Sequence, residues 1–161
     1  MKELKYEQHV LTVEEVKKSI RTFFENKCDE TFVEMIFNLL NSKVYIPARE
    51  ELLLIINKEN KIPKERMNDS RVLNKFYPYS IDGKTWLPIF LDKNINKEDL
   101  PKNAVIVETL FYYLCDLLWC KYSTLDGFII DPFDIGIRFE KEHIQMVCEL
   151  KELMDEEDID Y

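Results

Sequence analysis

Three aspartates and a histidine near the end of the chain are the side chains best suited to do chemistry. Asp126, Asp131 and Asp134 lie in the stretch LDGFIIDPFDIGIRF, residues 125–139, and His143 follows it. Carboxylates can bind a hard cation or act as a general acid, and an imidazole exchanges protons near neutral pH. A helix-loop-helix calcium site needs oxygen ligands at alternate positions, a mid-loop glycine and a later glutamate. The three aspartates have a different spacing and order, so the sequence predicts no metal site.

Turn chemistry explains the segment DPFD better than catalysis does. Asp131 occupies the first turn position, where its side chain can accept hydrogen bonds from backbone amides, and Pro132 occupies the second, where its fixed φ belongs. The flanks agree, because residues 128–130 are continuously apolar and residues 135–139 alternate between apolar and other side chains. The sequence therefore predicts a β-hairpin in which Asp131 and Pro132 are structural turn residues.

The catalytic interpretation is kept as an alternative. A small-ligand binder or hydrolase could use Asp126, Asp131, Asp134 and His143 in a cleft beside the hairpin, if at least two of these groups converge with shifted pKa values. A lone histidine in the first turn of a helix is more often a surface residue. The glycines lie only at positions 83, 127 and 136, so no phosphate-binding loop is present, and no serine occupies a nucleophile elbow. The first expectation is therefore a chain with no catalytic residue and no cofactor.

The cysteines give no sign of a zinc site. None of the four is part of a C-x-x-C motif, and the chain has only two histidines, His9 and His143. Each cysteine lies in or beside an apolar helical pattern, which favours buried reduced thiols. The four residues are Cys28, Cys115, Cys120 and Cys148.

The apolar pattern predicts an α/β (α+β) fold with a single domain at residues 1–154 and an acidic tail at 155–161. Thr12 and Glu15 form a capping-box pattern at the start of an extra N-terminal helix, residues 12–26. The chain should form a mixed sheet of about five or six strands with hairpins, and helices should pack against it. Further expected elements are a helix with Thr31 in a second capping box (29–42), strands at 43–48 and 104–109, a helix opened by Thr109 (110–122) and a last helix (140–154). Residues 49–70 are left unassigned.

A further hairpin is predicted around Asp82 and Gly83, because this pair supplies the two positive φ angles that a two-residue turn requires. Counting outward from the turn pairs Ile81 with Lys84, Tyr79 with Trp86, and Tyr77 with Pro88. Proline has no amide donor, so the pairs that contain proline indicate an edge position or an interrupted ladder.

The aromatic side chains of this hairpin define an aromatic face, made of Tyr77, Tyr79 and Trp86 with Phe90. Aromatic residues are enriched at the energetic centres of protein interfaces, so this face is a candidate partner surface. The same rings would be equally buried in a second core layer covered by the first helix. Both interpretations stay open at this point.

The charge of the chain narrows the choice of partners. The 161 residues carry a net charge of −9, and residues 155–161 contain five acidic side chains. Nucleic-acid binding needs clustered lysine and arginine, so no nucleic acid is expected as a partner. The acidic tail is expected to be a solvated, disordered end, although it could steer a basic partner. The sequence shows neither an export signal nor a membrane span, so we expect a cytoplasmic protein with no membrane partner.

The order of several short motifs resembles the SseB N-terminal domain family of bacteria. The motifs are KVYIPA, then DGKTWLPIFLDKNI, then a helix that runs into LDGFIIDPFDIGIRFEKEHI, and together they span roughly residues 30–150. In that family a strand ending in V-P-x precedes a hairpin of the form L-P-x-F-T-S, and a G-x-x-I-N-P-F element leads into the final helix. The positions that match, as framework residues, are Pro47, Pro88, Phe90, Gly127 and Pro132.

The chain departs from the family pattern at two places. Leu91-Asp92 stands where the family commonly has Thr-Ser, and Asp131 stands where it commonly has Asn. A role that depends on those polar side chains is therefore not carried over. The resemblance implies an α/β fold with a mixed sheet and packed helices, in a family whose molecular activity is poorly defined.

The sequence thus favours a non-catalytic, SseB-like bacterial module that acts through protein interaction or regulation. The absence of a catalytic arrangement and the aromatic face are the two reasons for this expectation. Its partner would be an unidentified protein, with basic charge as a complement to the acidic chain, or a second copy of the chain itself.

Overall fold

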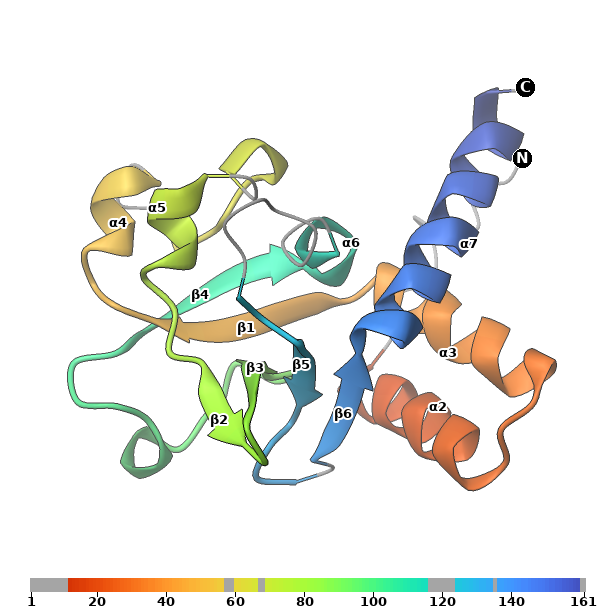
Figure 1. Cartoon of the computed structure of the whole chain (residues 1–161), viewed down its shortest axis with the longest axis horizontal. Helices are drawn as coiled ribbons and strands as arrows, with labels where there is room; N and C mark the ends of the chain where they lie inside the picture. Colours follow the sequence, from red (N-terminus) through yellow and green to blue (C-terminus); the bar gives the residue numbers. More distant parts are fainter. Residues whose placement is uncertain (1–11, 57–59, 67–68, 116–123, 135, 160–161) are drawn as a thin grey trace.

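The structure is a computed structural model that describes residues 12–56, 60–66, 69–115, 124–134 and 136–159, with the backbone alone for 151 and 154–159. Six α-helices, six strands and two 3₁₀ helices lie in this described part, which confirms the predicted mixed α/β class (Figure 1). In chain order they are α2 (Val13–Glu25), α3 (Asp29–Leu40), β1 (Lys43–Ala48), α4 (Leu52–Ile55), η1 (Lys64–Arg66), α5 (Ser70–Leu73), β2 (Tyr79–Ile81), β3 (Lys84–Ile89), η2 (Lys97–Asp99), β4 (Val105–Leu110), α6 (Phe111–Leu114), β5 (Gly127–Ile130), β6 (Ile137–Glu140) and α7 (Lys141–Ile159).

The strands form two sheets. Four strands lie in the order β2-β3-β5-β6, in which β3 and β5 are parallel and the two outer pairs are antiparallel. The other two strands, β1 and β4, form an antiparallel ribbon. The sheet is therefore mixed and contains hairpins, as expected, but it is divided in two.

Two prolines explain the division. Tyr45 of β1 exchanges both backbone hydrogen bonds with Phe90, at 2.8 and 2.9 Å, where β3 ends. The antiparallel register of this bridge places Pro47 opposite Pro88, and neither residue has an N–H to donate. The ladder between β1 and β3 therefore stops after one bridge. In the hairpin, the predicted interruption of the ladder is confirmed, because β2 ends at Tyr79 and the expected pair of Tyr77 with Pro88 does not form. The alternative of an edge position does not hold, because β3 is an inner strand.

The main core lies on one face of the four-stranded sheet. Leu87, Phe128 and Phe139 point to this face and are fully buried. Helices α2, α3 and α7 cover it beside β6 (Figure 1), and Phe24 of α2 contacts Phe139 edge to face at 5.8 Å. Burial of large apolar side chains between helices and sheet is the main stabilising contribution in such a layered fold.

The first helix forms as predicted. Thr12 and Glu15 make the reciprocal capping box at the start of α2, and the stripe of Val16, Ile20 and Phe23 is buried. The second helix starts at Asp29, as predicted, but its N-cap is Cys28 and Thr31 occupies the third helical position. The Thr31 hydroxyl accepts a hydrogen bond from the Cys28 amide at 3.2 Å, so Thr31 contributes to the cap from inside the helix.

Both predicted turns are present. Asp82 and Gly83 have φ angles of 52° and 77°, and the predicted pairs of Ile81 with Lys84 and Tyr79 with Trp86 are formed. The chain also reverses between β5 and β6, where the Asp134 amide donates to the Asp131 carbonyl at 2.9 Å. Local turn chemistry is therefore a sound guide in this chain.

Other sequence-based expectations need correction. Thr109 does not cap a helix, because β4 continues through it and its hydroxyl donates to the Ile62 carbonyl at 3.0 Å. Within the helix expected at 110–122, the structure shows helix at Phe111–Leu114, and residues 116–122, with Cys120, lie outside the described residues. The last helix does not stop before the acidic tail, because its backbone is helical to Ile159.

The unassigned and cysteine-containing segments are also placed. Residues 49–70 contain the short elements α4 and η1 and the first residue of α5. Cys115 is buried, as expected, and Cys148 is partly buried. Cys28 is exposed rather than buried, because it caps α3 at the surface. No helix within the described ranges has both the length and the apolar character needed to cross a membrane.

Replacement of Gly127 by alanine should destabilise the fold. A Cβ at Gly127 would collide with the carbonyl oxygen of Phe139 and lie 2.8 Å from the Trp86 ring. Overpacking of this kind costs about 1–3 kcal/mol of unfolding free energy, to be measured by urea denaturation. Gly83→Ala is the matched control, because a Cβ there meets no atom within 4 Å and only its positive φ opposes it. An equal loss in both variants would contradict the packing argument.

Candidate functional site

Asp131 forms hydrogen bonds that join the carboxyl ends of the parallel strands β3 and β5. The residue follows β5, is 5 % exposed and has a left-handed φ of 46°. Its amide donates a hydrogen bond to the Ile89 carbonyl oxygen at 2.8 Å, and its Oδ1 accepts a hydrogen bond from the Leu91 amide at 3.0 Å. Because Ile89 and Leu91 lie at the end of β3, these bonds join β3 to β5. Asp131 is a turn residue, as predicted, but the amide that its side chain binds belongs to a distant strand.

Lys17 of α2 lies between two of the predicted carboxylates. Its Nζ donates to Asp134 at 2.7 Å and is 3.4 Å from Oδ2 of Asp131. Burial raises the pKa of Asp131, against the opposing effects of the Leu91 amide and the Lys17 ammonium group. The hydrogen bond from Lys17 lowers the pKa of Asp134. Two of the four residues in the catalytic alternative therefore converge with shifted pKa values.

Lys17 was not among the predicted site residues, although the sequence carries a signal for it. Lys17 follows Val13 by four positions and precedes Ile20 by three, so it lies at the border of the apolar stripe of α2. A lysine at such a border can extend its stem along the core and place its ammonium group on a buried carboxylate. What the stripe does not reveal is which carboxylate lies opposite.

The other two residues of the catalytic alternative lie elsewhere. Asp126 precedes β5 and Asp131 follows it, and the Asp126 carboxylate accepts a hydrogen bond from the Thr85 amide at 2.8 Å. His143 accepts a hydrogen bond from the Glu140 amide through Nδ1 at 3.2 Å, and its ring packs on Phe139. The four groups do not form one cleft. Among the described residues, no group of three or more His, Cys, Asp or Glu side chains has the geometry to hold a metal ion.

The aromatic face is largely internal. Trp86 and Phe90 are 2 % and 6 % exposed, whereas Tyr77 and Tyr79 are partly exposed. Trp86 lies under the Arg138 guanidinium, and Phe133 covers Phe90 with ring centroids 6.1 Å apart. These rings belong to a second packed layer on the sheet face opposite the main core. Trp86 and Phe90 are therefore not available to a partner in this conformation, and the first helix is not their cover.

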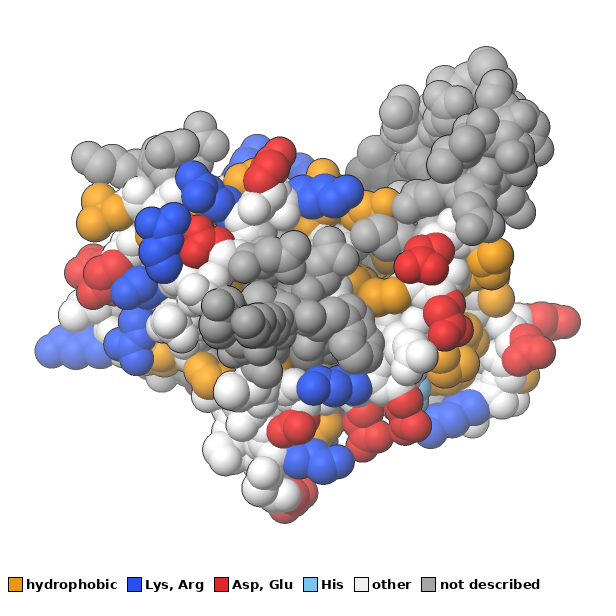
Figure 2. Space-filling view, turned by 45° about the horizontal axis from the view of Figure 1, so that its top comes forward, with side chains coloured by type: hydrophobic (Ala, Val, Ile, Leu, Met, Phe, Trp, Pro, Cys, Tyr) orange, Lys and Arg blue, Asp and Glu red, His pale blue; other side chains and the backbone are white. Residues whose placement is uncertain are grey.

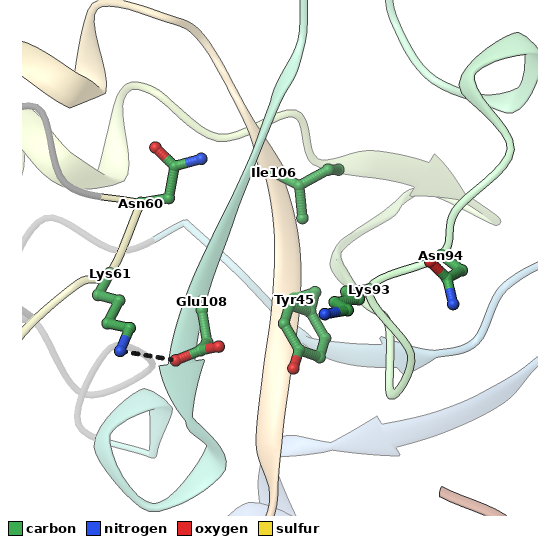
Figure 3. A pocket seen from close by; sticks show the side chains of 7 residues that line it. All are labelled: Tyr45, Asn60, Lys61, Lys93, Asn94, Ile106 and Glu108. Carbon is green, nitrogen blue, oxygen red and sulfur yellow. Dashed lines mark ion pairs between the residues drawn. The ribbon is translucent and has the colours of Figure 1, made fainter.

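The ribbon formed by β1 and β4 carries a concave surface. Tyr45 and Glu108 are directly opposite each other in its register, and Ile106 lies on the same outer face. Together they floor a pocket of about 660 Å³, which we call the ribbon hollow. Figure 3 shows that its walls come from separate segments, with Asn60 and Lys61 on one side and Lys93 and Asn94 on the other.

A smaller pocket adjoins the ribbon hollow along the same ribbon. It has a volume of about 430 Å³, and both pockets are lined by Lys61 and Glu108. Leu110 and Tyr113 supply apolar surface to the smaller pocket. The two pockets adjoin at Lys61 and Glu108 along β4, and together we call them the groove, which has apolar side chains at both ends.

The polar groups of the groove are only loosely paired with each other. The Lys61 ammonium group is 3.9 Å from Glu108 Oε2, and the Lys61 side chain is 72 % exposed. This separation exceeds hydrogen-bond length, so both groups retain the capacity to bind other atoms. Burial, followed by the charges of Glu108 and Asp92, raises the pKa of Tyr45, so its phenol stays protonated at neutral pH. The groove thus offers hydrogen-bond donors and cations around an apolar floor.

Comparison with known proteins gives no match of any kind. No protein-family model matches the chain, and neither a curated protein nor a solved structure is similar to it. The resemblance to the SseB N-terminal domain family consequently stays a prediction.

The pH dependence of the free energy of unfolding should reveal the burial of Asp131. Because the pKa of Asp131 is raised in the folded protein, its contribution to stability is present below its ordinary value of 3.8 and is lost as pH rises through the raised pKa. Urea denaturation should therefore show the stability of wild type falling relative to Asp131→Asn as pH increases above that value. Asp99→Asn, at an exposed position, is the control for the removal of a carboxylate. A wild-type advantage that grows with pH would mean that the attraction to Lys17 outweighs burial.

Proposed function

We propose that the chain is a non-catalytic, SseB-like protein-interaction domain of the bacterial cytoplasm, and that its partner surface is the groove along the β1–β4 ribbon. The observation that supports this proposal is the pair of adjoining pockets of about 660 and 430 Å³. Each volume lies within the range of about 300–1,000 Å³ that small-molecule sites have, but a single small molecule would occupy only one of the two pockets. Two open pockets in line suit a chain segment that lies along the ribbon.

The composition of the groove supports binding rather than catalysis. Tyr45 and Ile106 form a partly buried floor, while Lys61 and Asn60 are exposed at the rim. An apolar or aromatic centre within a polar rim is the usual anatomy of a protein interface. A Tyr45 phenol with a raised pKa is a poor nucleophile and a poor base, so it serves contact better than chemistry.

This proposal moves the partner surface away from the aromatic face. Two of its rings, Trp86 and Phe90, are buried in the chain, and a partner would have to displace Arg138 or Phe133 to reach them. The groove requires no such rearrangement, because Lys61 and the floor beneath it are already accessible.

The catalytic alternative retains one supporting observation. Asp131 and Asp134 meet at Lys17 beside a pocket of about 200 Å³ that Phe90 and Phe133 also line. This volume is below the range of about 300–1,000 Å³ that small-molecule sites usually have. Lys17 and Arg21 together also compensate the charge of the two carboxylates. An ion-pair contact that holds α2 against the β5–β6 turn explains the same geometry without catalysis.

A bulky side chain at the rim of the ribbon hollow should block the proposed binding. Peptides would be selected from a random display library on the wild-type protein, and their affinities measured by fluorescence polarisation. Asn94→Trp should weaken binding about tenfold or more, because the indole occupies the hollow without changing the charge. Asn74→Trp is the matched control, since Asn74 is equally exposed at the end of α5 and should leave affinity unchanged.

The selection can also refute the proposal. If no peptide binds, or if Asn94→Trp and Asn74→Trp bind the selected peptides equally well, the groove is not the partner surface. Thermal melting of both variants would exclude unfolding as the cause of a lost interaction.

Small-molecule binding tests the alternative function at Asp131 and Asp134. We expect a ligand-observed NMR screen of fragments to yield no compound whose binding to wild type is abolished by Asp134→Asn, because Lys17 already occupies the site. Glu98→Gln, an exposed carboxylate outside this pocket, is the control for a change in charge. Fragments lost only in Asp134→Asn would support the small-ligand reading instead.

A further inference from the structure

We propose that the occupant of the groove is an acidic, extended segment of another protein, anchored by an apolar or aromatic side chain. This inference rests on the proposed function and names the chemistry of the partner. It reverses the expectation from total charge, because an acidic chain as a whole suggests a basic partner. The local charge of the groove has the opposite sign.

The described lining of the groove is basic. Four positively charged side chains line the two pockets, and Glu108 alone is negatively charged among these lining residues. The four are Lys43, Lys61, Lys93 and Arg66. The neighbouring sequence agrees, since residues 43–75 contain eight Lys and Arg against five Asp and Glu, whereas residues 141–161 contain two against eight.

The charges are separated across the molecule. Figure 2 shows Lys and Arg side chains gathered over the end that carries α4 and α5, while Asp and Glu prevail over α3 and the described part of α7. A basic area within a chain of net charge −9 attracts acidic groups only at short range, since charges further than about 10 Å apart are screened in salt solution. The groove therefore selects by local charge.

Two ammonium groups reach over the floor from opposite walls. In Figure 3, Lys61 extends from one wall toward Glu108, and Lys93 extends from the other toward Tyr45. The long separation of 3.9 Å between Lys61 and Glu108 leaves the ammonium group able to donate to a partner carboxylate. A carboxylate that enters between Lys61 and Lys93 would accept hydrogen bonds from both ammonium groups.

The shape of the groove sets the conformation of the occupant. The floor runs along β4 from Ile106 to Leu110, a distance of about 13 Å at the usual rise of a strand. A segment of about four or five extended residues covers this length. Ile106 lies at one end, and Leu110 and Tyr113 lie at the other, where each can bury an apolar side chain.

Other occupants fit less well. A nucleic acid would bring several phosphates onto Glu108 in the middle of the groove, and its binding depends on a continuous track of cations. A second copy of the chain would oppose one basic rim to another if the same face were used. Any other arrangement would have to place an acidic segment of one copy in the groove of the other, and the chain's own acidic end is therefore tested below as a rival probe.

Charge reversal in the groove tests the chemistry of the partner. The peptides selected on the wild-type protein should be enriched in Asp and Glu. Lys61→Glu combined with Lys93→Glu should weaken their binding about tenfold or more, and an increase from about 0.05 to about 0.5 M salt should weaken it as well. Lys84→Glu combined with Lys102→Glu makes the same change in total charge at exposed positions outside both pockets, and should alter affinity less than about twofold.

The outcomes separate this inference from the proposed function. Peptides that are blocked by Asn94→Trp but are not acidic, or that tolerate the Lys61 and Lys93 reversals, would overturn the inference and leave the proposed function standing. A synthetic peptide MDEEDIDY, the chain's own end, and a single-stranded oligonucleotide serve as rival probes. Binding of either as tightly as the selected peptides would overturn the choice of a different protein as partner. If the double reversal unfolds the chain, Lys93→Gln alone, at an exposed position, gives the same test.

Discussion

The lack of backbone N–H donors at Pro47 and Pro88 determines how the strands divide into two sheets. Because the two residues face each other after the Tyr45–Phe90 bridge, β1 cannot continue alongside β3. The edge of β3 is consequently shared, with β2 at its start and β1 at its end. β1 pairs with β4 along its whole length through its other edge, and Ala48 at its end forms a bridge with Phe76. The ribbon is therefore a separate sheet, and its outer face carries the groove.

Features with short-range causes could be read from the sequence. The hairpin at Asp82-Gly83, the reversal at Asp131 and the capping box at Thr12 each depend on residues within a few positions of one another. Proline in a strand has a purely local cost, so the interrupted ladder at Pro88 could also be predicted. The errors at Thr31 and Thr109 concern hydroxyl groups, which can form hydrogen bonds with several kinds of partner. Each of these hydroxyls bonds to a backbone group that the helix-cap pattern does not specify.

Features that depend on distant segments could not be read in this way. Lys17 and Asp134 are separated by 117 positions, and only the packed structure brings them together. The walls of the ribbon hollow come from residues near 60 and near 93, and the first of these segments had no decisive pattern. The sign of the total charge differs from that of the described groove lining for the same reason, because charge counted along a chain does not show which side chains share a surface.

The parallel pairing of β3 with β5 has a consequence for the order in which the chain acquires its structure during synthesis. The hairpin of β2 and β3 is complete once Ile89 has left the ribosome, but the second edge of β3 stays without a partner until residues 127–130 emerge. An exposed strand edge is a template for pairing with other chains. A nascent polypeptide of this sequence therefore passes through a stage in which an apolar strand, Trp86 to Ile89, is open to solvent, chaperones and other unfinished chains.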